Sequence, residues 1–163
     1  MTMSQELLSE FDPEMKRTRK ALERLPDDRF DWKPHAKSTS AGRLAGHIAE
    51  LPGFSAGIMK TESLSLGNSD ANPAPMKNCA EVLALFDKNA AEAREAIAAA
   101  TDDYLSQQWH LSFQGKKMFE APRAAALRSS IRHLVHHRGQ LTVYLRLNDI
   151  PVPAIYGPSA DEM

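Results

Sequence analysis

Apolar residues recur at steps of three and four in four stretches of the chain, and stretches rich in Pro, Gly, Asn and Ser separate them. This period places the apolar side chains of a stretch on one face of an α-helix. The first stretch ends near Leu25, and its apolar face comprises Leu7, Leu8, Phe11, Met15, Thr18 and Leu22. Because proline fits best in a first helical turn, Pro13 indicates that this helix either bends at residues 12–13 or begins there.

The second helix is marked by a polar residue before its first apolar position. Ser40 has the properties of an N-cap, and the apolar period then predicts a helix over residues 41–61. Pro52 removes a backbone donor inside this helix and should bend it in the middle. The preceding residues 27–40 are expected to form an ordered loop held by Phe30 and Trp32.

The third helix follows a polar loop at residues 63–77. Asn78 and Glu81 have the spacing of a capping box and open an Ala-rich helix that ends near Ala100. Residues 101–120 lack the helical period. Apolar residues alternate there and Gly115 supplies a turn, which indicates either a short hairpin or extended chain.

The last helix begins at Pro122 and runs to about Leu147, where Asn148 and two following prolines end it. The remaining tail is expected to be extended, with contacts through Ile150, Ile155 and Tyr156. The sequence therefore predicts an all-α four-helix bundle in a single domain, residues 1–163, with a short non-helical segment before the last helix and an extended C-terminal tail.

Charge and composition narrow the classes of function. The formal net charge is −1, from 20 basic and 21 acidic residues, so no strong field draws the protein to nucleic acid. The chain shows neither a signal-peptide pattern nor a run of about 18 apolar residues. We therefore expect a cytoplasmic protein with no nucleic acid and no membrane as partner. Cys79 is the only cysteine, and an inert, partly buried thiol is favoured over a reactive one.

Three histidines stand out as candidate metal ligands. His133 and His137 are four residues apart on the last helix, which brings their rings to one face close to its apolar side. His136 points nearly opposite to that side, so it is expected at the surface or in a subunit contact. His47 lies within the apolar face of the second helix, where an unpaired imidazole would lose its hydration.

Each histidine signal alone has an ordinary explanation, namely a buried ring bonded to a carbonyl or a chance pair on a surface helix. Together they favour one divalent metal ion on His47, His133 and His137, with a fourth coordination position open for chemistry. Gln140 and Tyr144 project to the same side, where they either orient a substrate or simply pack. Glu50, one turn after His47, is a candidate general base or an orienting partner.

Two nearby features complete this interpretation. The last-helix pair is spaced H-L-V-H-H and lacks the glutamate of H-E-x-x-H peptidases, so peptidase activity is disfavoured. Arg138 lies near the centre of the apolar face and needs a partner, which predicts a structural ion pair or a dimer contact.

Three blocks of sequence resemble the DinB/YfiT-like superfamily of metal-dependent enzymes. They are FDWKPHAKSTSAGRLAGHIAEL, which leads into the second helix, the last-helix block IRHLVHHRGQLTVYLRL, and the tail IPVPAIYGPSADE. The resemblance places the metal ligands at His47, His133 and His137. It implies a four-helix bundle, commonly a homodimer, that holds nickel or zinc.

The resemblance also suggests a type of chemistry. Relatives include transferases and isomerases that use low-molecular-weight thiols such as bacillithiol and mycothiol. The leading hypothesis is therefore an enzyme that activates a thiol, or else water, for transfer or hydrolysis on a small electrophilic substrate. The alternative is a non-catalytic stress-response protein that binds a metal or a small ligand. A nucleic-acid-binding role, suggested by the damage-inducible family name, is disfavoured by the balanced charge.

Overall fold

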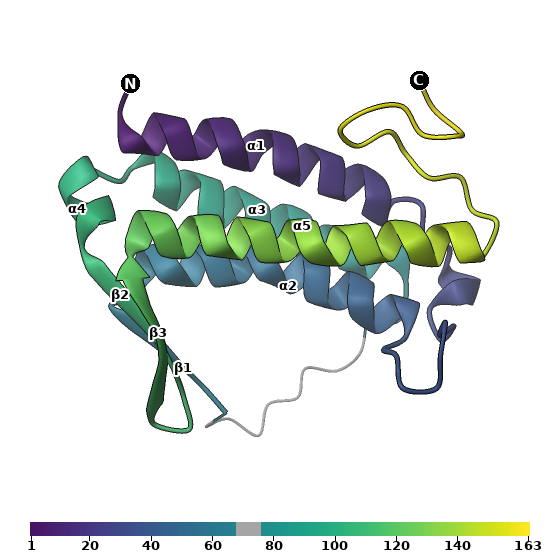
Figure 1. Cartoon of the computed structure of the whole chain (residues 1–163), viewed down its shortest axis with the longest axis horizontal. Helices are drawn as coiled ribbons and strands as arrows, with labels where there is room; N and C mark the ends of the chain where they lie inside the picture. Colours follow the sequence, from purple (N-terminus) through teal and green to yellow (C-terminus); the bar gives the residue numbers. More distant parts are fainter. Residues whose placement is uncertain (68–75) are drawn as a thin grey trace.

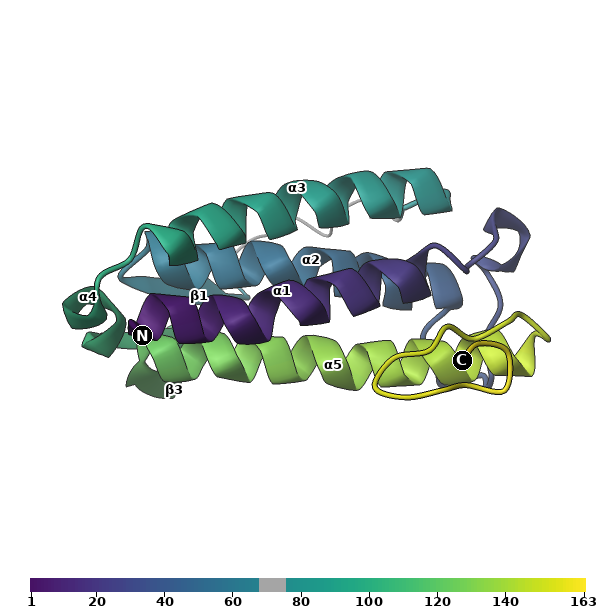
Figure 2. The ribbon, with the colours of Figure 1, turned by 90° about the horizontal axis from the view of Figure 1, so that it is seen from above.

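Four long helices lie side by side along the molecule and enclose its main core (Figure 1; Figure 2). The computed structural model describes residues 1–67 and 76–163. The long helices are α1 (Met3–Leu22), α2 (Ala41–Lys60), α3 (Cys79–Ala98) and α5 (Arg123–Leu147). Each of α1 and α2 packs against both α3 and α5. The four apolar faces predicted from the sequence thus share one core, with Leu7, Ile48, Phe86 and Leu134 among its members.

The helix starts follow from side-chain caps. Thr2 and Gln5 form a capping box at the start of α1, so the alternative that this helix begins at Pro13 is wrong. The Ser40 hydroxyl accepts from the backbone N–H of Arg43, and the Asn78 amide oxygen accepts from that of Glu81. Both residues are confirmed as N-caps, but the capping box predicted for α3 is only half formed, because the Glu81 carboxylate accepts from the N–H of Lys77 rather than from that of Asn78.

A small three-stranded sheet corrects the all-α prediction (Figure 1). Strands β2 (Gln108–Phe113) and β3 (Lys116–Pro122) are antiparallel, which confirms the hairpin alternative, and Gln114 and Gly115 turn the chain with φ of 48° and 79°. Strand β1 (Ser63–Leu66) pairs in parallel with β2, with Ser63 opposite His110. Part of the loop expected at residues 63–77 is thus a strand, and positions 68–75 of it lie outside the described residues.

A second correction concerns the stretch expected to lack helix. The short helix α4 (Asp102–Ser106) lies between α3 and the sheet, and the Thr101 hydroxyl caps it by accepting from the N–H of Tyr104. One helical turn is too short to show a repeating apolar period, which is why the sequence pattern missed it. A 3-10 turn (Asp27–Arg29) likewise lies within the predicted loop before α2.

Arg138 forms a buried ion pair with Glu14, which confirms the first of the two alternatives predicted for it. Its side chain is 2% exposed and lies 2.6 Å from a carboxylate oxygen of Glu14 on α1. It also donates to Thr18 Oγ1 at 3.2 Å and to the hydroxyl of Tyr156 at 2.7 Å. One buried cation therefore joins α1, α5 and the C-terminal tail, which curls back over α5 rather than extending away (Figure 2).

Candidate metal centre

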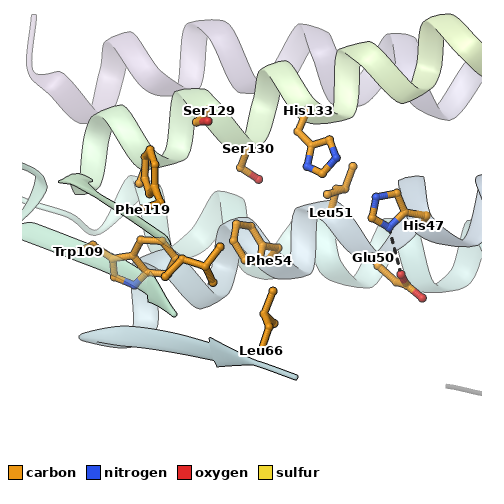
Figure 3. A pocket seen from close by; sticks show the side chains of 12 residues that line it. His47, Glu50, Leu51, Phe54, Leu66, Trp109, Phe119, Ser129, Ser130 and His133 are labelled. Atoms are coloured by element: carbon orange, nitrogen blue, oxygen red, sulfur yellow. Dashed lines mark ion pairs between the residues drawn. The ribbon is translucent and has the colours of Figure 1, made fainter. Parts of the chain in front are cut away.

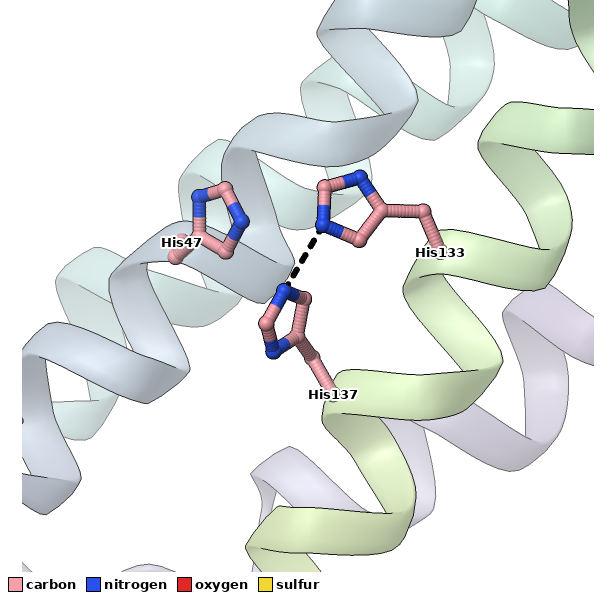
Figure 4. Close-up of side chains that lie close together, drawn as sticks. All are labelled: His47, His133 and His137. Atoms are coloured by element: carbon pink, nitrogen blue, oxygen red, sulfur yellow. Dashed lines mark hydrogen bonds between the residues drawn. The ribbon is translucent and has the colours of Figure 1, made fainter.

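The three candidate ligands converge between α2 and α5 (Figure 4). His47 comes from α2, whereas His133 and His137 come from successive turns of α5. Ring centroids are 5.4 Å apart for His47 and His133 and 4.6 Å apart for each of the other two pairs. One nitrogen from each ring lies within 4.8 Å of the other two. The chain thus brings together all three residues that the helical periods singled out.

The outward-facing nitrogens of two rings have partners that fix the ring orientation. His137 Nδ1 lies 2.7 Å from the amide oxygen of Gln140, one turn further along α5. His47 Nδ1 lies 3.5 Å from a carboxylate oxygen of Glu50, one turn further along α2 (Figure 3). An acceptor at Nδ1 holds the proton there and leaves Nε2 with a free lone pair, as metal-binding histidines require.

The electrostatics favour neutral rings. Partial burial, and then the neighbouring His137, lower the pKa of His47, against the opposing effect of Glu50. Partial burial lowers the pKa of His133 as well, with His137, His47 and His136 as further causes. These two rings are therefore more fully neutral at pH 7 than a free histidine, and neutral imidazole is the form that binds a metal ion.

The donor set fits a divalent ion with a preference for nitrogen ligands. The Nε2 atoms of His133 and His137 lie 2.8 Å apart and share a hydrogen bond. Bonds of about 2.0–2.1 Å to one tetrahedral ion would set two nitrogens at about 3.3 Å, so the rings of His133 and His137 need to separate by only about half an ångström. Three imidazoles leave a coordination position free, and nickel and zinc both accept such ligands.

Glu50 and Tyr144, two other predicted site residues, are each held by hydrogen bonds near the histidines. Both carboxylate oxygens of Glu50 accept from Arg43 Nη1, at 3.1 and 3.2 Å. Tyr144 donates its hydroxyl to the carbonyl of Thr39 at 3.1 Å, and its ring packs edge-on against Trp32. Arg43 was missed by the sequence analysis, although its position one helical turn before His47 and two before Glu50 places it on the same face.

Cavities lie on both sides of the histidine cluster. One, of about 520 Å³, includes His47, Glu50 and His133 in its wall (Figure 3). The other, of about 370 Å³, is lined by His47 and His137 together with Ser38, Thr39, Arg43, Leu44, Gln140 and Tyr144. The first was not foreseen, because four of its twelve lining residues, Leu66, Trp109, Leu111 and Phe119, come from the three-stranded sheet, whose pairing with β1 the sequence pattern did not reveal.

Two residues outside the cluster behave as expected from the sequence. His136 is exposed on α5 beside His137, with the ring centroids 5.0 Å apart. Cys79 is partly buried and its thiol donates to the carbonyl of Leu22, while burial, followed by the carboxylate of Asp27, raises the pKa of the thiol. A raised pKa leaves less thiolate at neutral pH and favours the inert interpretation.

No helix within residues 1–67 and 76–163 has the combined length and apolar character needed to span a bilayer.

Comparison with known proteins gives concordant matches. The family model described as "DinB family" matches residues 1–163. The uncharacterized protein YrdA of Bacillus subtilis (strain 168) is 29% identical over 156 residues, which cover 95% of this chain and 89% of YrdA. The uncharacterized protein YjoA of the same strain is 28% identical over 152 residues, covering 90% of this chain and 91% of YjoA.

Solved structures share the fold. A DinB-like protein from Bacillus cereus ATCC 10987 superimposes with a TM-score of 0.72 at 24% identity, covering 92% of this chain and 95% of that one. The DinB-like protein YjoA from Bacillus subtilis superimposes with a TM-score of 0.71 at 18% identity, covering 94% and 99%. At these identities the structural likeness concerns the fold alone.

Proposed function

This chain belongs to the DinB family, and we propose that it is a metal-dependent enzyme whose His47, His133 and His137 hold one divalent ion, nickel or zinc. The observation that carries the proposal is the convergence of three imidazoles from α2 and α5, with one ligand nitrogen of each within 4.8 Å of the others. A single unpaired ring has many explanations, whereas three rings on two helices that point at one another favour a shared cation.

A divalent ion bound there would hold a thiol as thiolate, or lower the pKa of a water molecule, and so supply a nucleophile at neutral pH. The protein's own residues hold the ligands in place. Glu50 and Gln140 accept at the Nδ1 atoms of His47 and His137 and keep the opposite nitrogens directed inward. Neither residue is required to leave this position during a reaction, so we assign both a positioning role.

The proposed reaction is transfer of a low-molecular-weight thiol to a small electrophile, or hydrolysis of that electrophile by water. The cavities on both sides of the histidines support a small-molecule reaction, since each adjoins at least one ligand ring and both adjoin His47. The cavity that contains Arg43 offers the more polar surroundings and suits a polar thiol co-substrate.

Metal content tests the site directly. The full-length protein, purified without a histidine tag or added metal, is compared with His47→Ala, His133→Ala, His137→Ala and the control His136→Ala by elemental analysis. We expect close to one ion per chain in the wild type and in His136→Ala, and a loss of most of the metal in the other three variants. Equal metal content in all five samples would contradict the proposal.

Turnover distinguishes the enzyme from a protein that only binds a metal or a small ligand. Metal-loaded wild type is assayed with electrophiles in the presence of bacillithiol, mycothiol or glutathione, and separately with esters, amides and lactones. We expect saturable turnover that is lost in His47→Ala and kept in His136→Ala. A fully metallated protein that turns over nothing in either panel would favour the binding function instead.

A further inference from the structure

The larger cavity beside the histidines has a mainly apolar wall at its end away from them (Figure 3). It lies between α2, α5 and the small sheet, with His47, Glu50 and His133 at one end. The rest of its wall is mainly the apolar side chains Leu51, Phe54, Leu66, Trp109, Leu111 and Phe119. Its volume of about 520 Å³ is within the usual range for small-molecule sites.

The residues at the apolar end of the cavity pack against a small core cluster that is separate from the main core. Trp109 is 1% exposed and forms a second core cluster with Ile58 and Ala126, separate from the main core. The ring of Phe54 stands edge-on to that of Trp109, with centroids 5.9 Å apart. Because these two rings are held by the sheet and by two helices, this part of the wall is preformed.

Polar groups in this cavity are few and lie toward α2 and α5. Ser130 is 4% exposed, and its hydroxyl is hydrogen-bonded to that of Ser55 at 2.8 Å. Glu50 is held by Arg43 and His47. Ser129 adds one further hydroxyl to the wall. With so few polar groups, a sugar or a nucleotide inside the cavity would leave most of its hydrogen-bonding groups without partners, which disfavours such ligands.

The cavity on the opposite side of the histidines has a mainly polar wall. Arg43, Gln140, Tyr144, Ser38 and Thr39 line it with polar groups. The three ligand rings therefore separate an apolar chamber from a polar one. A reaction between two molecules at this site would draw one partner from each side.

We propose that the electrophilic substrate is a small molecule with an apolar aryl or alkyl body that fills the larger cavity and a polar head directed at His47 and His133. This inference rests on the proposed metal-dependent function and adds the substrate class to it. Burial of each methylene against this wall is expected to tighten binding about fourfold, which corresponds to about 0.8 kcal/mol per methylene.

The test uses hydroxamic acids, because their head group binds divalent metals and the chain attached to it can be lengthened. Dissociation constants for straight-chain hydroxamates from acetohydroxamate to octanohydroxamate, and for benzohydroxamate, are measured by calorimetry on the metal-loaded full-length protein. Metal content is determined on the same samples. We expect affinity to rise about fourfold per methylene until the cavity is filled.

Matched variants on strand β3 locate the binding site. Phe119 lines the cavity and is 37% exposed, whereas its neighbour Met118 is 62% exposed and does not line it. Phe119→Ser should weaken octanohydroxamate about tenfold while acetohydroxamate and metal content stay unchanged. Met118→Ser should leave all three quantities at the wild-type level. Leu66→Ser, on strand β1, provides a second variant with the same expected pattern as Phe119→Ser.

Entry into the cavity also has an optical readout. In a Trp32→Phe background the remaining tryptophan is Trp109 in the cavity wall, and long-chain hydroxamates should change its emission while acetohydroxamate should not.

The outcomes separate the two proposals. A metallated protein whose affinity for hydroxamates does not depend on chain length, or depends on it equally in Phe119→Ser, overturns the apolar-substrate inference and leaves the metal site standing. A protein that takes up no metal and binds no acetohydroxamate overturns the proposed function and this inference with it.

Discussion

At the scale of single residues, the contacts of Glu50 decide between the two roles that the sequence left open for it. The sequence places it one turn after His47, which is compatible with a general base or with an orienting partner. In the structure its carboxylate is held by Arg43 and faces His47 Nδ1. A carboxylate so engaged suits the orienting role, because a general base needs an oxygen that is free to accept the substrate's proton.

The orienting role predicts an effect on metal affinity. Glu50→Ala should weaken metal binding by about 10- to 100-fold, because His47 loses the group that directs its Nε2 toward the ion. Competition with a fluorescent chelator measures the change. Glu92→Ala is the control, since Glu92 also pairs with a cation, Lys60, but lies on α3. Metal affinity that is unchanged in Glu50→Ala, together with lost turnover, would favour the general-base role instead.

The convergence of the three histidines could be predicted from the sequence, whereas the side chains around them could not. The positions of His133 and His137 follow from helical geometry alone, and His47 follows from its place in an apolar face. Arg43 gave no comparable signal, because a basic residue near a helix start usually indicates a solvated surface. Its role depends on the side-chain conformations of Arg43 and Glu50, which no periodicity reports.

At the scale of elements, the loop before α2 determines where His47 lies. Phe30 from this loop is buried against the first turn of α2 at Gly42, where an added Cβ would stand 2.5 Å from Phe30 Cδ1. The backbone N–H of Gly42 also donates to the carbonyl of Phe30 at 2.9 Å. Gly42 therefore has to be glycine for the loop to pack so closely on the helix.

Gly42→Ala should destabilise the fold by about 1–3 kcal/mol, because the new methyl group would force Phe30 out of its position. Gly139→Ala on α5 is the matched control, since an added Cβ there meets nothing within 4 Å. That substitution should stabilise the protein by about 0.5–1 kcal/mol through helix propensity. Urea unfolding of both variants measures the difference, and equal stabilities would refute the packing argument.

The pairing of β1 with β2 is the part of the element arrangement that could not be predicted from the sequence. Strand β1 has only four residues, and its parallel partner β2 lies far along the chain, so no local pattern announces the pairing. The hairpin was recognisable as one of two alternatives because Gly115 and alternating apolar residues lie close together in sequence. The four residues that the sheet contributes to the wall of the larger cavity were hidden for the same reason.

At the scale of the whole molecule, the C-terminal tail is fastened by two carboxylates. Asp161 pairs with Arg146 of α5 and accepts from the N–H of Val152, and these bonds, in that order, lower its pKa. Glu162 accepts from the N–H of Ala154 and pairs with Arg24 just beyond α1, and its pKa is also lowered. The tail therefore joins the ends of two helices.

This arrangement predicts how stability depends on pH. A carboxylate whose pKa is lowered by folding stabilises the folded state fully above its ordinary pKa, about 4, and that contribution is lost as the pH falls through the lowered value. The melting temperature of wild type should exceed that of Asp161→Asn at pH 7, and the difference should shrink as the pH falls below about 4 and through the lowered pKa of Asp161. Glu62→Gln, an exposed position, should show no such trend. A difference in melting temperature that does not shrink as the pH is lowered below about 4 would count against the stabilising role of the Asp161 carboxylate.

The general architecture was predictable because four long apolar periods and their caps each carry a local signal. The return of the tail over α5 was not, because it depends on single ion pairs between distant residues rather than on a repeating pattern. Arg138 was an intermediate case, since its need for a partner was evident from the helical wheel while the identity of Glu14 and Tyr156 was not.

The position of the histidine cluster has a consequence for folding. The three rings belong to α2 and α5, two helices that are separated along the chain by α3 and the hairpin. A cation held by all of them would tie these segments together as a crosslink does, and it would bind the native chain far better than an unfolded one. The concentration of available metal ion would then determine the stability of the folded protein, and with it the rate at which the protein is degraded, as well as its proposed activity.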